Sequence, residues 1–419
     1  MSNLDVPVPR SSLAARYQAI RERTERLCVR LEPEDYQLQS MPDCSPPKWH
    51  LAHTAWFFET FVLAPHAARF QPFHPLYCYL FNSYYEAVGD RWPRPARGLL
   101  SRPTVADVYA YRRSVDDQVI ALIESADERT ISAIAPLIEL GLHHEEQHQE
   151  LLLTDLKHAF GLNPLRPNYA PHAESSPPAP TPLEWNRHAG GVKWVGHDGS
   201  KFAFDNETPR HRVFVEAFEI ASRPVSCEEF LGFIEDRGYD RPELWLSDGW
   251  AARQRYEWSS PLYWRRNDPE SNWQVFTLRG ERPLNPAEPV CHVSYYEADA
   301  YARWAGARLP TEFEWETAAA ANEVRGNFLD SDRMHPFGGG FYGDVWIWTA
   351  SPYVAYPGYH PAAGALGEYN GKFMCNQIVL RGGSCVTPVG HIRPTYRNFF
   401  PPDARWQFSG IRLAKDLTT

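Results

Sequence analysis

The chain lacks the cysteine patterns that hold together small secreted domains and structural zinc sites. It has seven cysteines in 419 residues, an odd number, and none are spaced as C-x-x-C: Cys28, Cys44, Cys78, Cys227, Cys291, Cys375 and Cys385. A disulfide framework and a zinc knuckle are therefore both disfavoured. A reducing, cytoplasmic setting is the simpler expectation.

Long apolar runs and an excess of basic residues are also missing. No stretch approaches the ~20 apolar residues that a membrane-spanning helix needs. The opening residues, MSNLDVPVPRSS, have neither the basic start nor the apolar core of a secretory signal. The formal net charge is -10, whereas nucleic-acid and anionic-membrane partners normally require a basic face. We therefore expect neither a nucleic-acid nor a membrane partner, and the oligomeric state is left open.

A chain of 419 residues is too long for one ordinary core, so two or three domains are expected. Residues 1–162 carry the apolar periodicity of four helices, which predicts an antiparallel bundle. Ser11 and Ser12 are candidate caps of the first helix. We expect that helix to bury the following apolar side chains: Leu13, Tyr17, Ile20 and Leu27.

The other three helices have their own boundary signals. The second should begin after Pro46 and Pro47 and run to about Pro65. Thr104 followed by Asp107 matches a capping box for the third helix, and the fourth should begin near Pro136. The stretch 65–103 between the second and third helices is rich in proline and aromatic residues, and connections of this length are usually functional.

The composition changes after the fourth helix. Residues 163–183 contain seven prolines, which predicts an extended linker. Residues 184–419 are rich in Gly, Trp and Asn and contain short alternating segments such as HRVFVEAFEIA. One clear helix is expected, in VSYYEADAYARWAGARLPTEFEWETAAA. This half predicts a separate α+β domain with much irregular structure.

Two histidines in the fourth helix have the spacing of a metal-binding pair. His144 and His148 are four residues apart, so they share a helix face and can hold one ion. We expect that face to be turned inward, with these neighbours on it: Leu137, Leu140, Gly141 and Leu151. Glu146, Glu150 and Lys157 should lie on other sides. Imidazoles on an inward face are costly unless they are paired, and a metal ion would pair with them.

A third ligand should come from the second helix, which carries His50 and His53. Spacing alone leaves both open. The register with Trp49, Trp56 and Thr60 favours His53. Three histidines from facing helices would leave coordination positions open on the ion.

A different class of function is also compatible with this segment. His144 to His148 has the sequence HEEQH, which matches the H-E-x-x-H helix of zinc peptidases and would make Glu145 the general base of a zinc hydrolase. No clear third ligand follows at peptidase spacing. A non-enzymatic binding module is a further alternative.

Several motifs together resemble a known family. HLAHTAWFFE and HHEEQHQELLL resemble the DinB-like bundle of the ergothioneine-biosynthesis sulfoxide synthases. The second half resembles the C-type-lectin-like fold of formylglycine-generating enzymes and sulfatase-modifying factors, through these motifs: GGVKWVG, EPVCHVSYYEADAYARWAGARLPTEFEWETAAA, DVWIWTASPY, LRGGSC and FSGIRLAKD. The resemblance implies an α+β multidomain fold, with a bundle in 1–162 and a sulfatase-modifying-factor-like domain in 184–419 that supplies a substrate pocket.

The resemblance also implies a cofactor and a reaction. Iron(II), Fe(2+), would be bound by His53, His144 and His148. Hercynine, the trimethylated betaine of histidine, would be joined at its imidazole C2 carbon to a thiol, giving a sulfoxide. Dioxygen accepts four electrons, and C–S bond formation plus sulfur oxidation supplies four.

Further residues follow from the same resemblance. Gln147 matches a glutamine that hydrogen-bonds the substrate imidazole. Asn398, Phe399 and Phe400 match residues that line the betaine pocket, and aromatic walls suit a quaternary ammonium group.

The chain departs from one branch of the family and matches another. A tyrosine that follows the WxWT motif in the first branch is absent here, where Gly358 occupies the expected place. The second branch instead has paired tyrosines after the second helix, which match Tyr84 and Tyr85 and imply that these two are catalytic. Asp43 and Arg94 are the corresponding candidates for binding the amino and carboxylate groups of the thiol.

The second branch is linked to cysteine rather than γ-glutamylcysteine, so cysteine is the expected thiol. A selenosugar is an alternative donor, because a close relative of this family joins hercynine to selenium with the same architecture. No residue in the sequence decides between sulfur and selenium.

Overall fold

The structure is a computed structural model that describes residues 10–171, 181–268 and 271–417. The chain divides into two compact units. The first comprises Met1–Ala159 with Gly364–Leu366, and the second comprises Phe160–Ala363 with Gly367–Thr419. No helix among the described residues is both long and apolar enough to cross a membrane.

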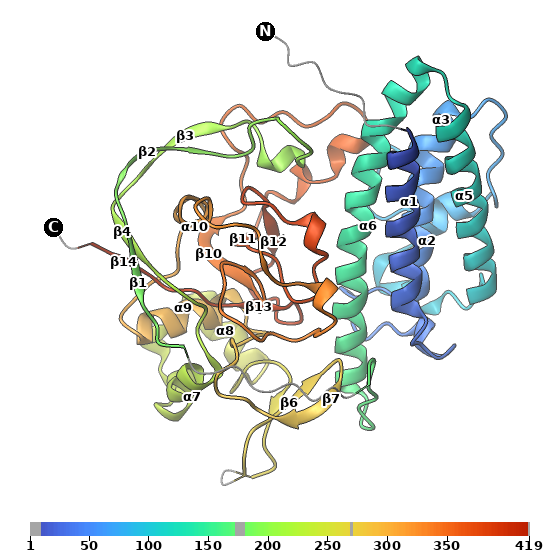
Figure 1. Cartoon of the computed structure of the whole chain (residues 1–419). Helices are drawn as coiled ribbons and strands as arrows, with labels where there is room; N and C mark the ends of the chain where they lie inside the picture. The colour runs from blue at the N-terminus through green and yellow to red at the C-terminus, as the bar shows by residue number, and fades with distance from the viewer. Residues whose placement is uncertain (1–9, 172–180, 269–270, 418–419) are drawn as a thin grey trace. The chain divides into compact units, whose positions relative to one another are not determined.

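The first unit is a helical bundle, as predicted. Its four main helices run alongside one another (Figure 1): α1 (Arg10–Cys28), α2 (Pro47–Phe58), α5 (Val105–Ser125) and α6 (Glu128–Leu162). Shorter elements lie between them: η1 (Asp35–Gln37), η2 (Glu59–Leu63), α3 (Ala64–His66), α4 (Tyr77–Phe81) and η3 (Arg94–Leu99). The long connection 65–103 is therefore partly helical.

Two helix starts differ from the prediction. Helix α1 already includes Arg10, so Ser11 and Ser12 lie inside it and the prediction that they cap it is wrong; serine inside a helix costs only a few tenths of a kcal/mol. Helix α6 begins at Glu128 rather than near Pro136. Pro136 lacks the N–H that would donate to the carbonyl of Ser132, and both residues lie at exposed positions of the helix.

Other local predictions are confirmed. Thr104 and Asp107 form a reciprocal capping box at the start of α5. The second helical stretch begins at Pro47 and passes from α2 through a π-helical turn, η2, into α3. Every residue of α2 is buried, so burial alone does not distinguish His50 from His53. The predicted apolar side chains of α1 are also buried: Leu13, Tyr17, Ile20 and Leu27.

The buried surface of α6 differs from the one expected. Leu137, Leu140 and Leu151 are only half-buried, whereas these side chains are fully buried: Ile134, Ile138, Leu142, Leu152 and Leu153. The polar residues that we placed on other sides of the helix are buried as well: Glu146, Glu150 and Lys157. Periodicity defines the faces of a helix, but the packing partners decide how many of them are covered.

The described residues of the second unit form five small sheets, and Figure 1 shows several of their strands. Their strands are β1 (Trp185–His188), β2 (Gly191–Val195), β3 (His211–Val215), β4 (Phe218–Ala221), β5 (Trp264–Arg265), β6 (Gln274–Thr277), β7 (Gly280–Pro283), β8 (Gly326–Asn327), β9 (Tyr342–Gly343), β10 (Trp346–Pro352), β11 (Ile378–Arg381), β12 (Asn398–Phe400), β13 (Ser409–Gly410) and β14 (Ala414–Asp416). The four-stranded sheet has the order β12-β11-β10-β13, so β12 lies at its edge. The predicted α+β character is confirmed.

After β4, the part of this unit that the structure describes has four α-helices where the sequence predicted one: α7 (Cys227–Glu235), α8 (Ser247–Arg255), α9 (Tyr295–Trp304) and α10 (Glu312–Ala319). The single long helix that we expected is divided into α9 and α10. Helices α7, α9 and α10 each begin with a capping box, so a systematic search for S/T-x-x-E would have found three starts.

The stretch 163–183 is only partly described, because residues 172–180 of the expected linker lie outside the described residues. In the described part, Tyr169 and Ala170 are buried. Both of their amides donate to the carbonyl of Leu278, at 2.9 and 3.0 Å. This part of the stretch therefore belongs to the second unit, where it packs on the turn between β6 and β7.

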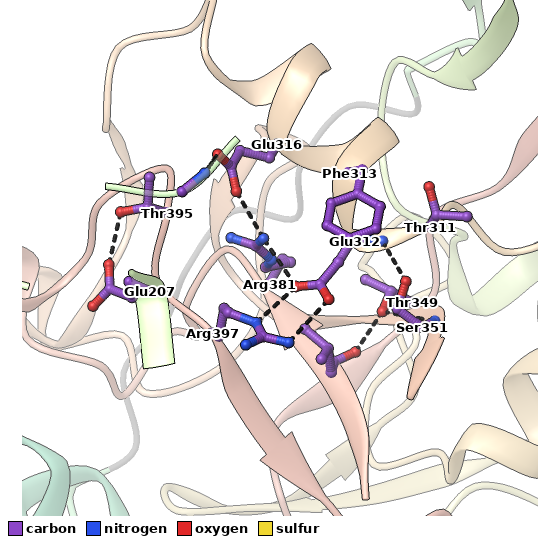
Figure 2. A network of polar contacts seen from close by, with 12 residues as sticks. Glu207, Thr311, Glu312, Phe313, Glu316, Thr349, Ser351, Arg381, Thr395 and Arg397 are labelled. Atoms are coloured by element: carbon purple, nitrogen blue, oxygen red, sulfur yellow. Dashed lines mark hydrogen bonds and ion pairs between the residues drawn. The ribbon is translucent and has the colours of Figure 1, made fainter. Parts of the chain in front are cut away.

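A buried ion-pair network holds the core of the second unit together, and Glu312 is its centre (Figure 2). Arg397 donates to both oxygens of the Glu312 carboxylate, at 2.8 and 3.0 Å. Arg381 contacts Glu312 at 3.2 Å and Glu316 at 2.8 Å. The network connects the first turn of α10 with the end of β11 and with the residue that precedes β12.

We predict that Glu312→Gln lowers the free energy of unfolding of the second unit by about 3–5 kcal/mol, because it leaves a buried guanidinium without its counter-charge. Urea unfolding followed by tryptophan fluorescence measures the change. Glu323→Gln is the matched control, since it removes only an exposed ion pair with Arg325. A loss of less than ~1 kcal/mol in Glu312→Gln would show that the network is dispensable.

Candidate metal centre

The structure brings His53 of α2 together with His144 and His148 of α6. One ring nitrogen from each lies within 4.8 Å of the other two. All three side chains are buried, with exposed fractions of 0%, 1% and 8%. The three residues singled out in the sequence therefore form one cluster that could hold a metal ion.

The surroundings of His53 leave one of its ring nitrogens for a ligand. Its Nδ1–H donates to the carbonyl oxygen of Phe81 at 2.6 Å. Its buried Nε2 has no hydrogen-bond partner among the described residues. The ring is sandwiched between Trp49, with centroids 4.4 Å apart, and Trp56, at 5.3 Å. These contacts hold the imidazole plane and direct Nε2 toward the cluster.

His50, the competing candidate, contacts the cluster from outside. Its Nδ1 lies 2.8 Å from Nδ1 of His148, and its Nε2 lies 3.1 Å from Oδ2 of Asp155. His50 is not part of the group whose ligand atoms converge.

Burial keeps the three imidazoles in the neutral form that binds metals. It lowers the pKa of His53 and of His148 well below the usual value, with a further contribution from neighbouring His144. Burial lowers the pKa of His144 to about 3, against the opposing effect of Glu145. Because neutral imidazole carries a lone pair, all three rings can act as ligands at neutral pH.

These residues fit a catalytic metal ion. Three imidazoles occupy one side of an ion and leave its other positions for substrates. The orphaned Nε2 of His53 is the kind of buried polar atom that a ligand would satisfy. Imidazole suits iron(II), zinc and copper alike, so the donor set by itself does not select the metal.

Glu145 is locked in a separate buried network. One carboxylate oxygen accepts from Arg21 at 2.7 Å. The other accepts from Thr24 at 2.6 Å and from Arg112 at 3.0 Å. Burial alone would raise the pKa of Glu145, but the two guanidinium groups and the hydroxyl lower it. Both oxygens are occupied, which disfavours Glu145 as the general base of a zinc hydrolase.

The same network braces the two ligand-bearing helices. Arg112 also donates to Thr54 at 2.8 Å and to the carbonyl of Leu51 at 2.9 Å, so it connects residues next to His53 and next to His144. Gly141 permits α6 to lie close to α2, since a Cβ at this position would lie 2.5 Å from the ring of Phe58.

The predicted tyrosine pair lies on the loop after α4. Tyr84 and Tyr85 stack on each other with centroids 4.7 Å apart. Tyr85 is fully buried, and its ring contacts Trp56 at 5.5 Å. Tyr84 is half-buried. Trp56 thus contacts both Tyr85 and His53, whereas Tyr84 is the more accessible of the two tyrosines.

The predicted residues Asp43 and Arg94 are also in contact, but the contact is with the backbone of Asp43 and not with its carboxylate. Arg94 donates to the carbonyl oxygen of Asp43, and both side chains are exposed.

Unlike Arg94, a neighbouring arginine that was not among the predicted residues lies inside the bundle. Arg97 is buried, lies 3.3 Å above the centre of the Trp49 ring and donates to Ser45 and Ser83. Burial and nearby Arg94 lower its pKa well below the usual value. Among the residues that the structure describes, no carboxylate forms an ion pair with Arg97.

The remaining predicted residues lie on two different elements. Gln147 is half-buried on α6, three residues after His144. Asn398, Phe399 and Phe400 make up β12 and are half-buried. The Phe399 ring is stacked on Tyr353, with centroids 4.0 Å apart and planes 9° from parallel.

Family comparisons cover nearly the whole chain. A model of the DinB superfamily matches residues 16–152. A model of the sulfatase-modifying factor enzyme 1-like domain matches residues 187–339 and 339–417. Hercynine oxygenase of Mycolicibacterium smegmatis is 32% identical over 98% of this chain and all of its own length. The chain belongs to the hercynine oxygenase family.

Two further relatives agree with this assignment. Hercynine oxygenase of Mycobacterium tuberculosis is 34% identical over 97% of this chain and 99% of its own. The formylglycine-generating enzyme of Streptomyces coelicolor is 31% identical, but over 35% of this chain and 50% of its own. The resemblance inferred from the motifs is confirmed by membership in the hercynine oxygenase family and by the two domain models.

Sequence reasoning missed three residues beside the cluster: His50 as a contact of His148, Asp155 and Arg97. Two of them have a sequence signal. Asp155 follows His148 by seven residues, or two helical turns, so both lie on one face of α6. His50 precedes His53 by about one turn. Arg97 has no such signal, because its place depends on the fold of the long connection.

We predict that the metal-free protein loses stability as the pH falls from about 6.5 toward 3. An unfolded histidine takes up a proton near pH 6.5, whereas His144 in the folded chain resists protonation until about pH 3. In this pH window the unfolded chain takes up a proton that the folded chain does not, so the free energy of unfolding decreases as the pH falls. Urea unfolding at several pH values measures how the free energy of unfolding depends on pH. This free energy should fall less steeply with decreasing pH in His144→Gln than in the parent. His74→Gln, at an exposed position, should keep the pH dependence of the parent. The same pH dependence in all three proteins would refute the lowered pKa of His144.

Proposed function

We propose that this chain is an iron(II)- and oxygen-dependent enzyme that joins hercynine, at its imidazole C2 carbon, to a thiol and oxidises the sulfur to a sulfoxide. The observation that carries the proposal is a cluster of three buried, neutral histidines in a chain whose near-full-length relatives are named hercynine oxygenases.

The reaction balances without an external reductant. The C2–H of hercynine, the S–H of the thiol and one dioxygen become the C2–S(=O) product and one water. Dioxygen takes up four electrons, two from C–S bond formation and two from oxidation of sulfur. When bound, iron(II) would supply the one-electron chemistry that lets dioxygen react with these substrates.

The protein's own groups would hold and orient the substrates. His53, His144 and His148 would occupy one side of the ion and leave the other side for the reactants. Gln147, one residue before His148, would hydrogen-bond the hercynine imidazole. Asn398, Phe399 and Phe400 would bind the betaine, with the trimethylammonium group against an aromatic face.

The thiol donor is proposed to be cysteine, and its carboxylate has a physically suited partner. Arg97 is a buried guanidinium hydrogen-bonded to two serine hydroxyls, so an incoming carboxylate would supply its counter-charge. Asp43 and Arg94 remain candidates for the amino and carboxylate groups at the exposed end of the same region.

We expect the iron-loaded protein to consume one dioxygen per sulfoxide when given hercynine and cysteine. Oxygen electrode traces and mass spectrometry measure this ratio, and His53→Ala should abolish turnover because it removes one ligand. His74→Ala, at an exposed histidine, is the control. No product from any donor, or zinc-dependent hydrolysis lost in Glu145→Ala, would refute the proposal.

The donor is decided by direct competition among cysteine, γ-glutamylcysteine and a selenosugar. We expect cysteine to be consumed first. Turnover with the selenosugar alone would replace the sulfur reaction by C–Se bond formation on the same site.

We predict that Tyr84→Phe shifts turnover from sulfoxide formation toward plain thiol oxidation, since it removes only the phenolic hydroxyl group and with it the proton donor. Tyr85→Phe should change the product ratio less, because Tyr85 is fully buried and its ring contacts Trp56. Tyr79→Phe, at an exposed position on α4, serves as the control. Product ratios measured by mass spectrometry that are unchanged in both Tyr84→Phe and Tyr85→Phe would remove the pair from the mechanism.

A further inference from the structure

The geometry points to Asp155 and His50 as a two-residue relay that sets the tautomer of His148 and so makes its Nε2 the metal-binding atom. This inference deepens the proposed function and rests on it in one respect, since it takes the three-histidine cluster as a metal site. His50 and Asp155 are positioning residues in this scheme and do not touch the ion.

The relay begins at Asp155, which can only accept hydrogen bonds as a carboxylate. Its Oδ2 accepts from the backbone amide of Ser45 at 2.8 Å and lies 3.1 Å from Nε2 of His50. A neutral His50 must therefore carry its hydrogen on Nε2. Both side chains are buried, so water does not compete for this bond.

The next contact then has only one consistent arrangement. With its hydrogen on Nε2, His50 has a bare lone pair on Nδ1, 2.8 Å from Nδ1 of His148. His148 must donate its own Nδ1–H into that lone pair. The lone pair of His148 is thereby placed on Nε2, on the opposite side of the ring.

The reverse arrangement would disable the ligand. If His50 carried its hydrogen on Nδ1, it would donate to His148, whose hydrogen would then occupy Nε2. A protonated Nε2 cannot bind a metal ion. Asp155 thus decides, through one intervening ring, whether His148 is a ligand. Carboxylate or carbonyl partners commonly orient metal-binding histidines, and His53 obtains the same orientation directly from the Phe81 carbonyl.

The placement of the two residues also couples the helices. Asp155 lies two turns beyond His148 on α6, while His50 lies about one turn before His53 on α2. One ligand-bearing helix therefore orients the histidine of the other. The Ser45 contact extends the brace to the loop that precedes α2.

The test is the affinity of the metal-free full chain for Co2+, followed by its d–d absorption. We expect His50→Leu and Asp155→Leu each to weaken binding roughly 10- to 100-fold. The double variant should bind Co2+ no more weakly than the single variant with the lower affinity, because the two residues act in series. His50→Asn should retain more affinity than His50→Leu, since an amide oxygen near the Nδ1 position can still accept from His148.

His158→Leu is the matched control. It lies on the same helix and hydrogen-bonds Ser40 at 2.7 Å but takes no part in the relay, so its Co2+ affinity should equal that of the parent. Parental affinity in His50→Leu and Asp155→Leu, with unchanged thermal stability of the metal-free proteins, would overturn the relay. A parent chain that binds no Co2+ would instead refute the metal site on which the proposed function depends.

A second measurement needs no variant and so remains decisive if the leucine variants do not fold. Long-range 1H–15N NMR of the Zn2+-loaded, 15N-histidine-labelled parent reports which ring nitrogen carries hydrogen. We expect hydrogen on Nδ1 of His148 and on Nε2 of His50. Hydrogen on Nδ1 of His50, or metal coordination through Nδ1 of His148, would overturn the inference.

Discussion

A buried imidazole without a counter-charge must be neutral and must find a partner for each ring nitrogen, and this constraint organises the first unit. His53 meets it with a backbone carbonyl on one side and a nitrogen turned toward His144 and His148 on the other. The aromatic rings that enclose it, Trp49 and Trp56, exclude water and lower the pKa of the cluster. The same apolar packing that stabilises the bundle thus prepares three lone pairs for a metal ion.

Buried charge is the second organising feature, and each unit has its own network. In the bundle, Arg21 and Arg112 neutralise Glu145. In the second unit, Arg381 and Arg397 neutralise Glu312. Such networks add little net stability compared with apolar packing, but breaking one partner is costly. Their geometric effect is the clearer one: Arg112 connects the neighbours of two candidate ligands, and Arg397 directly precedes β12.

The buried ring nitrogens and the buried charges give different environments to residues that share one sequence motif. His144, Glu145 and His148 form an H-E-x-x-H string, yet the histidines face the cluster while the glutamate faces two arginines. His50 and His53 are equally buried, yet one joins the cluster and the other contacts Asp155. A motif specifies spacing along a helix. The charges and lone pairs on facing helices decide what each residue does.

The sequence by itself determined the two-part organisation, the bundle followed by an α+β region, because helical periodicity and capping boxes are local signals. It also determined that His144 and His148 share one helix face, since four residues make about one turn. Only the tertiary structure decided which histidine of α2 joins them, that Glu145 is held by arginines, and that Arg97 is buried over Trp49. Those outcomes depend on contacts between residues 33 to 124 positions apart, and no local pattern records them. The start of α6 was missed for a related reason: an exposed turn of a helix can do without one backbone hydrogen bond, so a proline need not mark the beginning of a helix.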